Sequence, residues 1–215
     1  KYDKQGHGLS EQATKTLSIG TYADDLIALL ATLSIHKVIP IGLSIGGLIA
    51  QEPYRKRPEL VDKLILTNTA TKIGSEENWN KRIQAVKENG LSSISDLILS
   101  RWFGSGFAAN HPDRCAMAKA ILLQTSDAGY VAACQALAGA DLTAYASSIQ
   151  VPTLCIAGSH DQATPTHIVS AMADLIPQSE FFELPGVGHI PSLEAEKEFT
   201  QTILNFLSKY EEGDS

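Results

Sequence analysis

Short apolar runs alternate with longer amphipathic stretches along this chain. The first three short runs are almost continuously apolar, which is typical of strands that helices cover on both faces. The longer stretches have apolar residues at helical spacing. This alternation predicts an α/β fold with a mostly parallel sheet flanked by helices. The predicted strands are residues 37–41, 63–68, 153–157 and 180–184, and the predicted core helices are residues 21–33, 45–57, 164–175 and 194–208.

The pattern changes between residues 71 and 148, where strand signals vanish and helical spacing dominates. Helices inserted between two strands of such a sheet cover the strand ends, where α/β proteins place their ligand crevice. We therefore predict a helical lid at residues 71–148 and a core made of residues 1–70 and 149–215. Within the core, residues 211–215 have the composition of a frayed tail.

Composition narrows the classes of function. With 215 residues, of which 44% are hydrophobic, the chain can bury one sizeable core. Its net charge of −7, with no basic cluster longer than Arg55-Lys56-Arg57, argues against a nucleic-acid partner. The sequence has no apolar run of membrane-spanning length and no export leader, so we expect neither a membrane partner nor export. Three cysteines without paired spacing, Cys115, Cys134 and Cys155, are expected to be buried and reduced, which favours the cytoplasm.

The clearest chemical signal is Gly42-Leu43-Ser44-Ile45-Gly46, which lies between a predicted strand and a predicted helix. A G-x-S-x-G turn in this position forces the serine into a strained conformation that exposes its hydroxyl as a nucleophile. We expect both flanking glycines to be required because a Cβ at either position would collide with the strand or helix. The alternative is a close-packed turn without chemistry.

A serine nucleophile needs a base and an orienting carboxylate. Asp161 follows the strand at 153–157, and His189 follows the strand at 180–184. The order Ser44, Asp161, His189 is the order of nucleophile-elbow hydrolases, so we predict that these three are the catalytic residues. Asp161 alone could instead cap the following helix, and His160 is a weaker alternative base. The histidines and cysteines have no metal-ligand spacing, so we predict no metal.

These residues resemble the α/β-hydrolase fold enzymes and, within them, the 3-oxoadipate enol-lactonases. The resemblance covers essentially the whole chain. The elbow and the three predicted catalytic residues specify the superfamily, and the features of the predicted lid indicate the lactonase subgroup. The matching segments are Tyr2 to Ser10, Gly42 to Gly47 with Ala50-Gln51, Asn68 to Ala70 with Ile73-Gly74, Trp79-Asn80 with Arg82-Ile83, Arg101 to Phe103, and Pro152 to Pro165.

The resemblance implies a small enol-lactone substrate with a free carboxylate, opened by water to 3-oxoadipate during breakdown of aromatic compounds, without a cofactor. The N–H of Ile45 would stabilise the oxyanion. For the carboxylate, we expect Arg101 beside Trp102 first and Arg82 beside Trp79 second. A general carboxylesterase, a carbon–carbon bond hydrolase, a perhydrolase-like enzyme and a catalytically silent binding protein remain open.

Two features depart from the family pattern. Pro53 lies inside the predicted helix after Ser44, where proline typically costs about 3 kcal/mol, so we expect a kink and lower stability. The family also has several strands before the segment that begins at Lys1, and three or four strands take about 40–50 residues. We expect those strands and a second oxyanion donor on a separate or upstream segment that pairs beside residues 38–41. Without that segment, residues 38–41 are expected to form an exposed apolar edge, and residues 1–215 alone to show little hydrolase activity.

Overall fold

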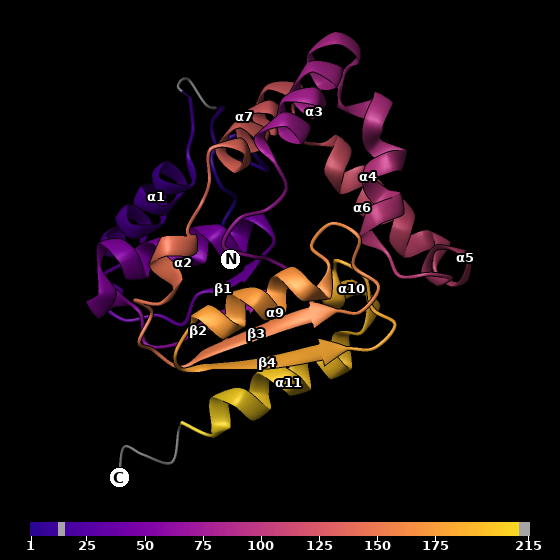
Figure 1. The fold of residues 1–215 in the computed structure, drawn as a ribbon. Helices are drawn as coiled ribbons and strands as arrows, with labels where there is room; N and C mark the ends of the chain where they lie inside the picture. The colour runs from indigo at the N-terminus through magenta and orange to yellow at the C-terminus, as the bar shows by residue number, and fades with distance from the viewer. Residues whose placement is uncertain (13–15, 211–215) are drawn as a thin grey trace.

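The computed structural model describes residues 1–12 and 16–210, and the predicted tail at 211–215 lies outside them. Its sheet has four parallel strands in chain order (Figure 1). Leu43 pairs with Thr67, Thr67 with Ile156, and Gly158 with Leu184, so the carboxyl ends of the strands lie at one edge. The predicted parallel α/β sheet is confirmed. The strands are β1 (Ile41–Leu43), β2 (Leu64–Thr67), β3 (Thr153–Gly158) and β4 (Ser179–Leu184).

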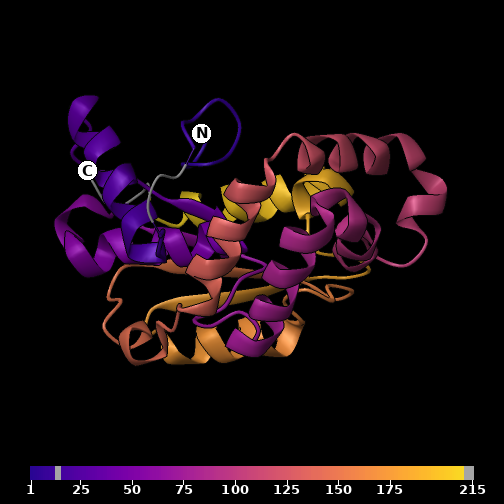
Figure 2. The same cartoon turned by 90° about the horizontal axis from the view of Figure 1, so that it is seen from above.

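Helices cover both faces of this sheet. Leu64 and Leu66 of β2 belong to a core cluster that includes residues of α2 (Ile45–Lys56) and α9 (Thr166–Leu175). Ile65, between them, faces a second cluster with Phe206 of α11 (Glu196–Ser208). This alternation is the period of two that a strand imposes. Figure 2 shows α9 and α11 on opposite sides of the strands. The remaining core helices are α1 (Ile19–Thr32), which packs on α2, the short 3₁₀ helix η1 (Pro58–Leu60) and α10 (Pro191–Glu194).

Every element assigned in the described chain between β2 and β3 is helical. The elements are α3 (Glu76–Asn89), η2 (Leu91–Ile94), α4 (Ser95–Trp102), α5 (Phe107–Asn110), α6 (Pro112–Leu123), α7 (Asp127–Ala138) and α8 (Thr143–Ala146). Most of them, α3 to α7, group together at the top and right of Figure 1, whereas α8 packs on α9 of the core. They have a core of their own, with Ile83, Ile98 and Leu122, while Leu137 of this segment joins a cluster with Tyr22 of α1. The predicted helical composition agrees with the structure, and a lid function remains a prediction.

The prediction for the first strand was wrong in position. β1 begins at Ile41 rather than at residue 37, because Pro40 has no N–H to donate to a ladder. Before it, Val38 makes only an isolated bridge to Val61. α2 covers one face of β1, but Ile41 is 56% exposed because β1 lies at the edge of the described sheet, as expected for an apolar edge without a further strand beside it.

Two predicted helices begin or divide elsewhere. α9 begins at Thr166, not at residue 164, because the chain there turns around Asp161. The predicted helix at 194–208 is divided, since Ala195 leaves helical geometry with φ −142° between α10 and α11. α2, by contrast, continues through the buried Pro53 without interruption, and the expected kink remains a prediction.

The three cysteines are free thiols. Cys134 and Cys155 are buried as predicted, and burial raises their thiol pKa to about 11 and about 12. Cys115 is half-buried, so the prediction for it was wrong. It lies on α6, where only Ala118 and Leu122 are buried.

Candidate active site

Ser44 occupies the junction between β1 and α2, with φ 55° and ψ −122°. Its N–H donates to the Thr67 carbonyl at 3.1 Å, and the Thr69 hydroxyl donates to the Ser44 carbonyl at 2.7 Å. The backbone on both sides of the strained residue is therefore held by the adjacent strand and the loop that follows it. The N–H groups of Ile45 and Gly46 belong to the first helical turn, where N–H groups lack intrahelical partners.

Two glycines of this turn are required, but not the two that the motif suggested. A Cβ on Gly42 would lie 2.2 Å from the Gly46 carbonyl oxygen, as expected. A Cβ on Gly46 would meet no atom within 4 Å, so the expectation for Gly46 was wrong. The crowded helical position is Gly47, whose Cβ would lie 2.4 Å from the Thr69 side chain. A methyl group on Gly46 would therefore enter open space, whereas one on Gly47 would overlap the loop that follows β2.

Asp161 and His189 are joined by a buried hydrogen bond of 2.8 Å between Oδ2 and Nδ1. They come from the loops after β3 and β4. Those loops lie so close that a Cβ on Gly158 would be 2.2 Å from the Gly188 carbonyl oxygen. The contact orients the imidazole, and in this arrangement Nδ1 faces the carboxylate while Nε2 stays available.

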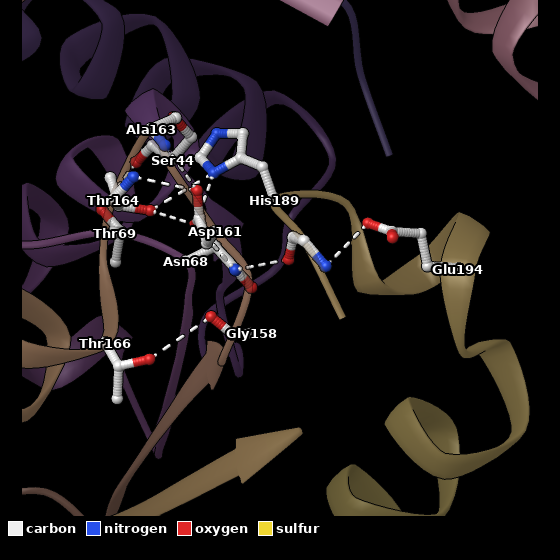
Figure 3. Close-up of polar contacts among 11 residues, drawn as sticks. Ser44, Asn68, Thr69, Gly158, Asp161, Ala163, Thr164, Thr166, His189 and Glu194 are labelled. Atoms are coloured by element: carbon white, nitrogen blue, oxygen red, sulfur yellow. Dashed lines mark hydrogen bonds and ion pairs between the residues drawn. The ribbon is translucent and has the colours of Figure 1, made fainter. Parts of the chain in front are cut away.

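Asp161 accepts more hydrogen bonds than the one from His189 (Figure 3). Its Oδ2 accepts from the Asn68 amide at 2.9 Å and from the Thr164 hydroxyl at 2.6 Å. Its Oδ1 accepts from the N–H groups of Ala163 and Thr164 at 2.7 and 3.0 Å. Burial acts to raise the pKa of Asp161, but the hydrogen bond and charge of His189, followed by the side-chain bonds of Thr164 and Asn68, outweigh it and hold the pKa below its usual range. The carboxylate therefore stays ionised.

The sequence reasoning missed Asn68 and Thr164. Asn68 directly follows β2 with φ 45°, a conformation in which asparagine is enriched, and its amide also donates to the Gly188 carbonyl at 3.1 Å. Its position at a strand end was the available signal. The alternative role of Asp161 as a cap of α9 is not observed, since Pro165 occupies the N-cap position.

His160 makes a different contact from His189. Its Nδ1 lies 3.3 Å from the Ser105 hydroxyl at the exposed surface. Within the described chain, His189 is the histidine that pairs with Asp161.

Glu194 holds the histidine loop against the helical segment. One carboxylate oxygen accepts the N–H of Gly188 at 2.9 Å and the other accepts the N–H of Gly104 at 2.8 Å. The His189 N–H in turn donates to the Trp102 carbonyl at 2.6 Å. Burial raises the pKa of Glu194 above its usual range, against the lowering effect of the two glycine N–H groups.

All but one of the predicted site residues line one cavity of about 500 Å³. Asp161 lies behind His189 rather than in the wall. No hydrogen bond between Ser44 and His189 occurs among the described contacts, although Figure 3 shows them as neighbours. Such bonds often tighten only when substrate binds. The predicted residues that line the cavity are Ser44, Ile45, Trp79, Arg82, Arg101, Trp102 and His189.

The two predicted arginines differ in their surroundings. Arg82 is half-buried, with its guanidinium 5.0 Å from the centre of the Trp79 ring and a 3.3 Å hydrogen bond to the Tyr130 hydroxyl. Arg101 is exposed, in the last turn of α4. Arg82 therefore makes more contacts within the protein than Arg101, and the expected order of the two as carboxylate ligands remains a prediction.

The arrangement offers a hydroxyl, an imidazole and an ionised carboxylate at the carboxyl edge of a parallel sheet, which are the groups of a serine hydrolase. The sequence pattern of the alpha/beta hydrolase fold matches residues 2–196. The chain belongs to this family, and its general activity is that of a hydrolase.

Known relatives refine the picture. The 3-oxoadipate enol-lactonase 2 of Acinetobacter baylyi is 33% identical over 97% of this chain and 78% of its own length. The enol-lactonase of Burkholderia xenovorans LB400 superposes with a TM-score of 0.93 at 33% identity, covering 96% of this chain and 79% of that one. A thermophilic esterase of Thermogutta terrifontis, in a malate-bound structure, gives a TM-score of 0.91 at 30% identity, with coverage of 96% and 78%.

Residues 1–12 and 16–210 contain no group of three or more His, Cys, Asp or Glu side chains placed to hold a metal ion. None of the helices described in this chain is both long and apolar enough to span a bilayer.

Proposed function

We propose that this chain hydrolyses carboxylic esters or lactones through an acyl-serine intermediate. The observation that carries the proposal is the buried Asp161–His189 hydrogen bond of 2.8 Å, behind a cavity that Ser44 and His189 share. Ser44 attacks the carbonyl carbon while His189 takes its proton. Asp161 fixes the imidazole tautomer and stabilises the cation that forms.

The reaction then proceeds in two halves. Collapse of the tetrahedral adduct expels the alcohol or enol oxygen, which His189 protonates, and leaves the acyl group on Ser44. His189 next deprotonates a water, whose oxygen attacks the acyl carbon. Collapse of this second adduct breaks the bond to the Ser44 oxygen, which His189 protonates, and releases the carboxylic acid. The Ile45 N–H donates to the oxyanion in both adducts, and losing one such donor typically costs about 2.7–4 kcal/mol of barrier. The chemistry uses no cofactor.

For the substrate, we propose a small enol-lactone with a free carboxylate, namely 3-oxoadipate enol-lactone, opened to 3-oxoadipate in aromatic catabolism. The names of the relatives at 33% identity support this choice. So do Arg82 and Arg101 in the cavity wall, since arginine binds carboxylates through two parallel hydrogen bonds. The free thiols are consistent with a cytoplasmic location, which we include in the proposal.

The test combines a covalent probe with a substrate panel, using the complete natural polypeptide. A fluorophosphonate should label the protein and should fail to label Ser44→Ala, and hydrolysis should fall by at least about 10³-fold in that variant. Carboxylate-bearing enol-lactones should be hydrolysed faster than neutral lactones and aryl esters.

If Ser44→Ala is labelled as strongly as the wild type, Ser44 is not the nucleophile. Labelling of Ser44 with a preference for neutral aryl esters would instead identify a general esterase, the activity named for the malate-bound relative.

A further inference from the structure

The charge of the cavity is opposite to the charge of the chain. The described residues that line it include three cations, Lys4, Arg82 and Arg101, and no aspartate or glutamate. The whole chain has a net charge of −7. Lys4 and Arg82 are partly buried, so their charges are less well solvated than on the open surface, and an anionic ligand would offset that loss of solvation.

Lys4 is the cation among these that the sequence did not predict. It lies in the loop of residues 1–10, outside the helical segment that carries Arg82 and Arg101. Lys4 therefore contributes to the cavity wall from the core part of the chain, and Arg82 and Arg101 contribute from the helical segment. A cation on each side would fix both the position and the direction of an acidic substrate.

The Lys4 ammonium has no hydrogen bond or ion pair within the described chain. The centre of the Tyr22 ring lies 6.0 Å from the ammonium, and the Asp3 carboxylate attracts it electrostatically. The Asp3 carboxylate is itself turned toward the Leu9 N–H, which donates to it at 3.1 Å. Lys56, by contrast, donates to the Gly20 carbonyl at 2.7 Å and pairs with Asp24.

The surroundings of Lys4 keep its charge available for a ligand. Burial lowers the pKa of Lys4 to about 8, with partial compensation from Asp3, so the ammonium is largely charged at neutral pH. Its neighbour His7 also lines the cavity, and burial followed by the Lys4 charge lowers the pKa of His7 to about 4. His7 is therefore neutral. The Tyr22 hydroxyl is fully buried with no partner among the described residues, and burial raises its pKa to about 12.

We propose that Lys4 is a specificity-determining residue that binds the anionic group of an acidic ester or lactone from the core side of the cavity. The inference rests on the proposed function of the same site, since it concerns which substrates reach Ser44. The partner is a carboxylate, whose oxygens accept from an ammonium.

The test compares two esters that differ in charge and by a single methyl group: mono-4-nitrophenyl glutarate and its methyl ester. In the complete natural polypeptide, Lys4→Met should lower kcat/KM for the anionic ester by about tenfold, because one charged hydrogen bond is lost. The methyl ester should change less than twofold. Lys87→Met, at an exposed position of α3 outside the cavity wall, is the matched control and should change neither value.

The pH dependence provides a readout that a purely structural lysine would not affect. The groups around Lys4 are Asp3, His7 and Tyr22, and neither His7, at about 4, nor Tyr22, at about 12, titrates near pH 8. The Lys4 charge is present below pH 8 and is lost as the pH rises through 8. The ratio of anionic to neutral kcat/KM should therefore fall across pH 8, whereas Lys4→Arg should hold it constant because arginine stays charged.

Each outcome supports or overturns the proposal. An unchanged ratio in Lys4→Met, or a wild-type ratio that is flat through pH 8, would overturn it. If Lys4→Met does not fold, the pH profiles of the wild type and of Lys4→Arg still separate the two results. Failure of the proposed function is separate, because hydrolysis of both esters would then persist in Ser44→Ala.

Discussion

At the scale of single residues, the site depends on two backbone conformations that L-residues rarely adopt. Ser44 has φ 55° at the end of β1, and Asn68 has φ 45° at the end of the neighbouring β2. Each such conformation costs on the order of 1–3 kcal/mol and persists only where its surroundings fix it. Ser44 could be predicted because its motif is local. The role of Asn68 could not, because its partner Asp161 lies 93 positions further along the chain.

A matched pair of glycine variants tests the packing of the elbow. Gly47→Ala should destabilise the protein by about 1–3 kcal/mol, because the new methyl group overlaps the Thr69 side chain at the turn. Gly46→Ala should keep or slightly raise stability, since the methyl group meets open space and alanine favours a helix. Urea unfolding of both variants measures the difference. Equal free energies of unfolding would show that Thr69 yields without cost.

At the scale of elements, apolar periodicity predicted which segments form strands and helices, and local chemistry shifted their ends. β1 begins after Pro40, α9 begins after the residues that bond to Asp161, and the last predicted helix is divided at Ala195. These are effects of individual N–H groups and turns, which periodicity does not report. β1 lies at the edge of the described sheet, which agrees with the exposed apolar edge expected where no further strand pairs beside it.

Pro53 gives a prediction at this scale. Pro53→Leu should raise the melting temperature, because the leucine N–H can donate to the Ile49 carbonyl within α2 and a helix-interior proline typically costs about 3 kcal/mol. Each kcal/mol gained should add about 2–4 °C in a chain of this length. Pro112→Leu is the control, because Pro112 starts α6, where proline is favourable, and its replacement should give no increase. Calorimetry that finds no increase for Pro53→Leu would refute the prediction.

At the scale of the whole molecule, the cavity exists because the helical segment meets the sheet edge. Ser44 and His189 of the core line it on one part of the wall, and Trp79, Arg82 and Trp102 of the helical segment line another. The two parts are tied at the histidine loop by Glu194 and by the His189–Trp102 backbone bond. Movement of the segment should therefore move the imidazole.

Removing this tie should affect both stability and catalysis. Glu194→Ala leaves the N–H groups of Gly104 and Gly188 without acceptors, so we expect a loss of about 1–3 kcal/mol of stability for each group that stays buried. We also expect a lower kcat, because His189 loses its fixed position. Glu194→Gln keeps one acceptor oxygen, so its stability and kcat should lie between those of the wild type and those of Glu194→Ala. Thermal unfolding and ester kinetics measure these effects, and a normal kcat in Glu194→Ala would exclude a positioning role.

The sequence by itself determined the class of fold, the elbow serine and the order of its two partners. These follow from apolar periodicity, from turn residues at strand ends and from the parallel sheet that places those ends together. Only the tertiary structure decided that Asn68 and Thr164 hold Asp161, that Gly47 rather than Gly46 is crowded, and that Lys4 lines the cavity. Each of these depends on contacts between segments that are far apart in the sequence. A local sequence pattern does not determine how such segments pack against one another.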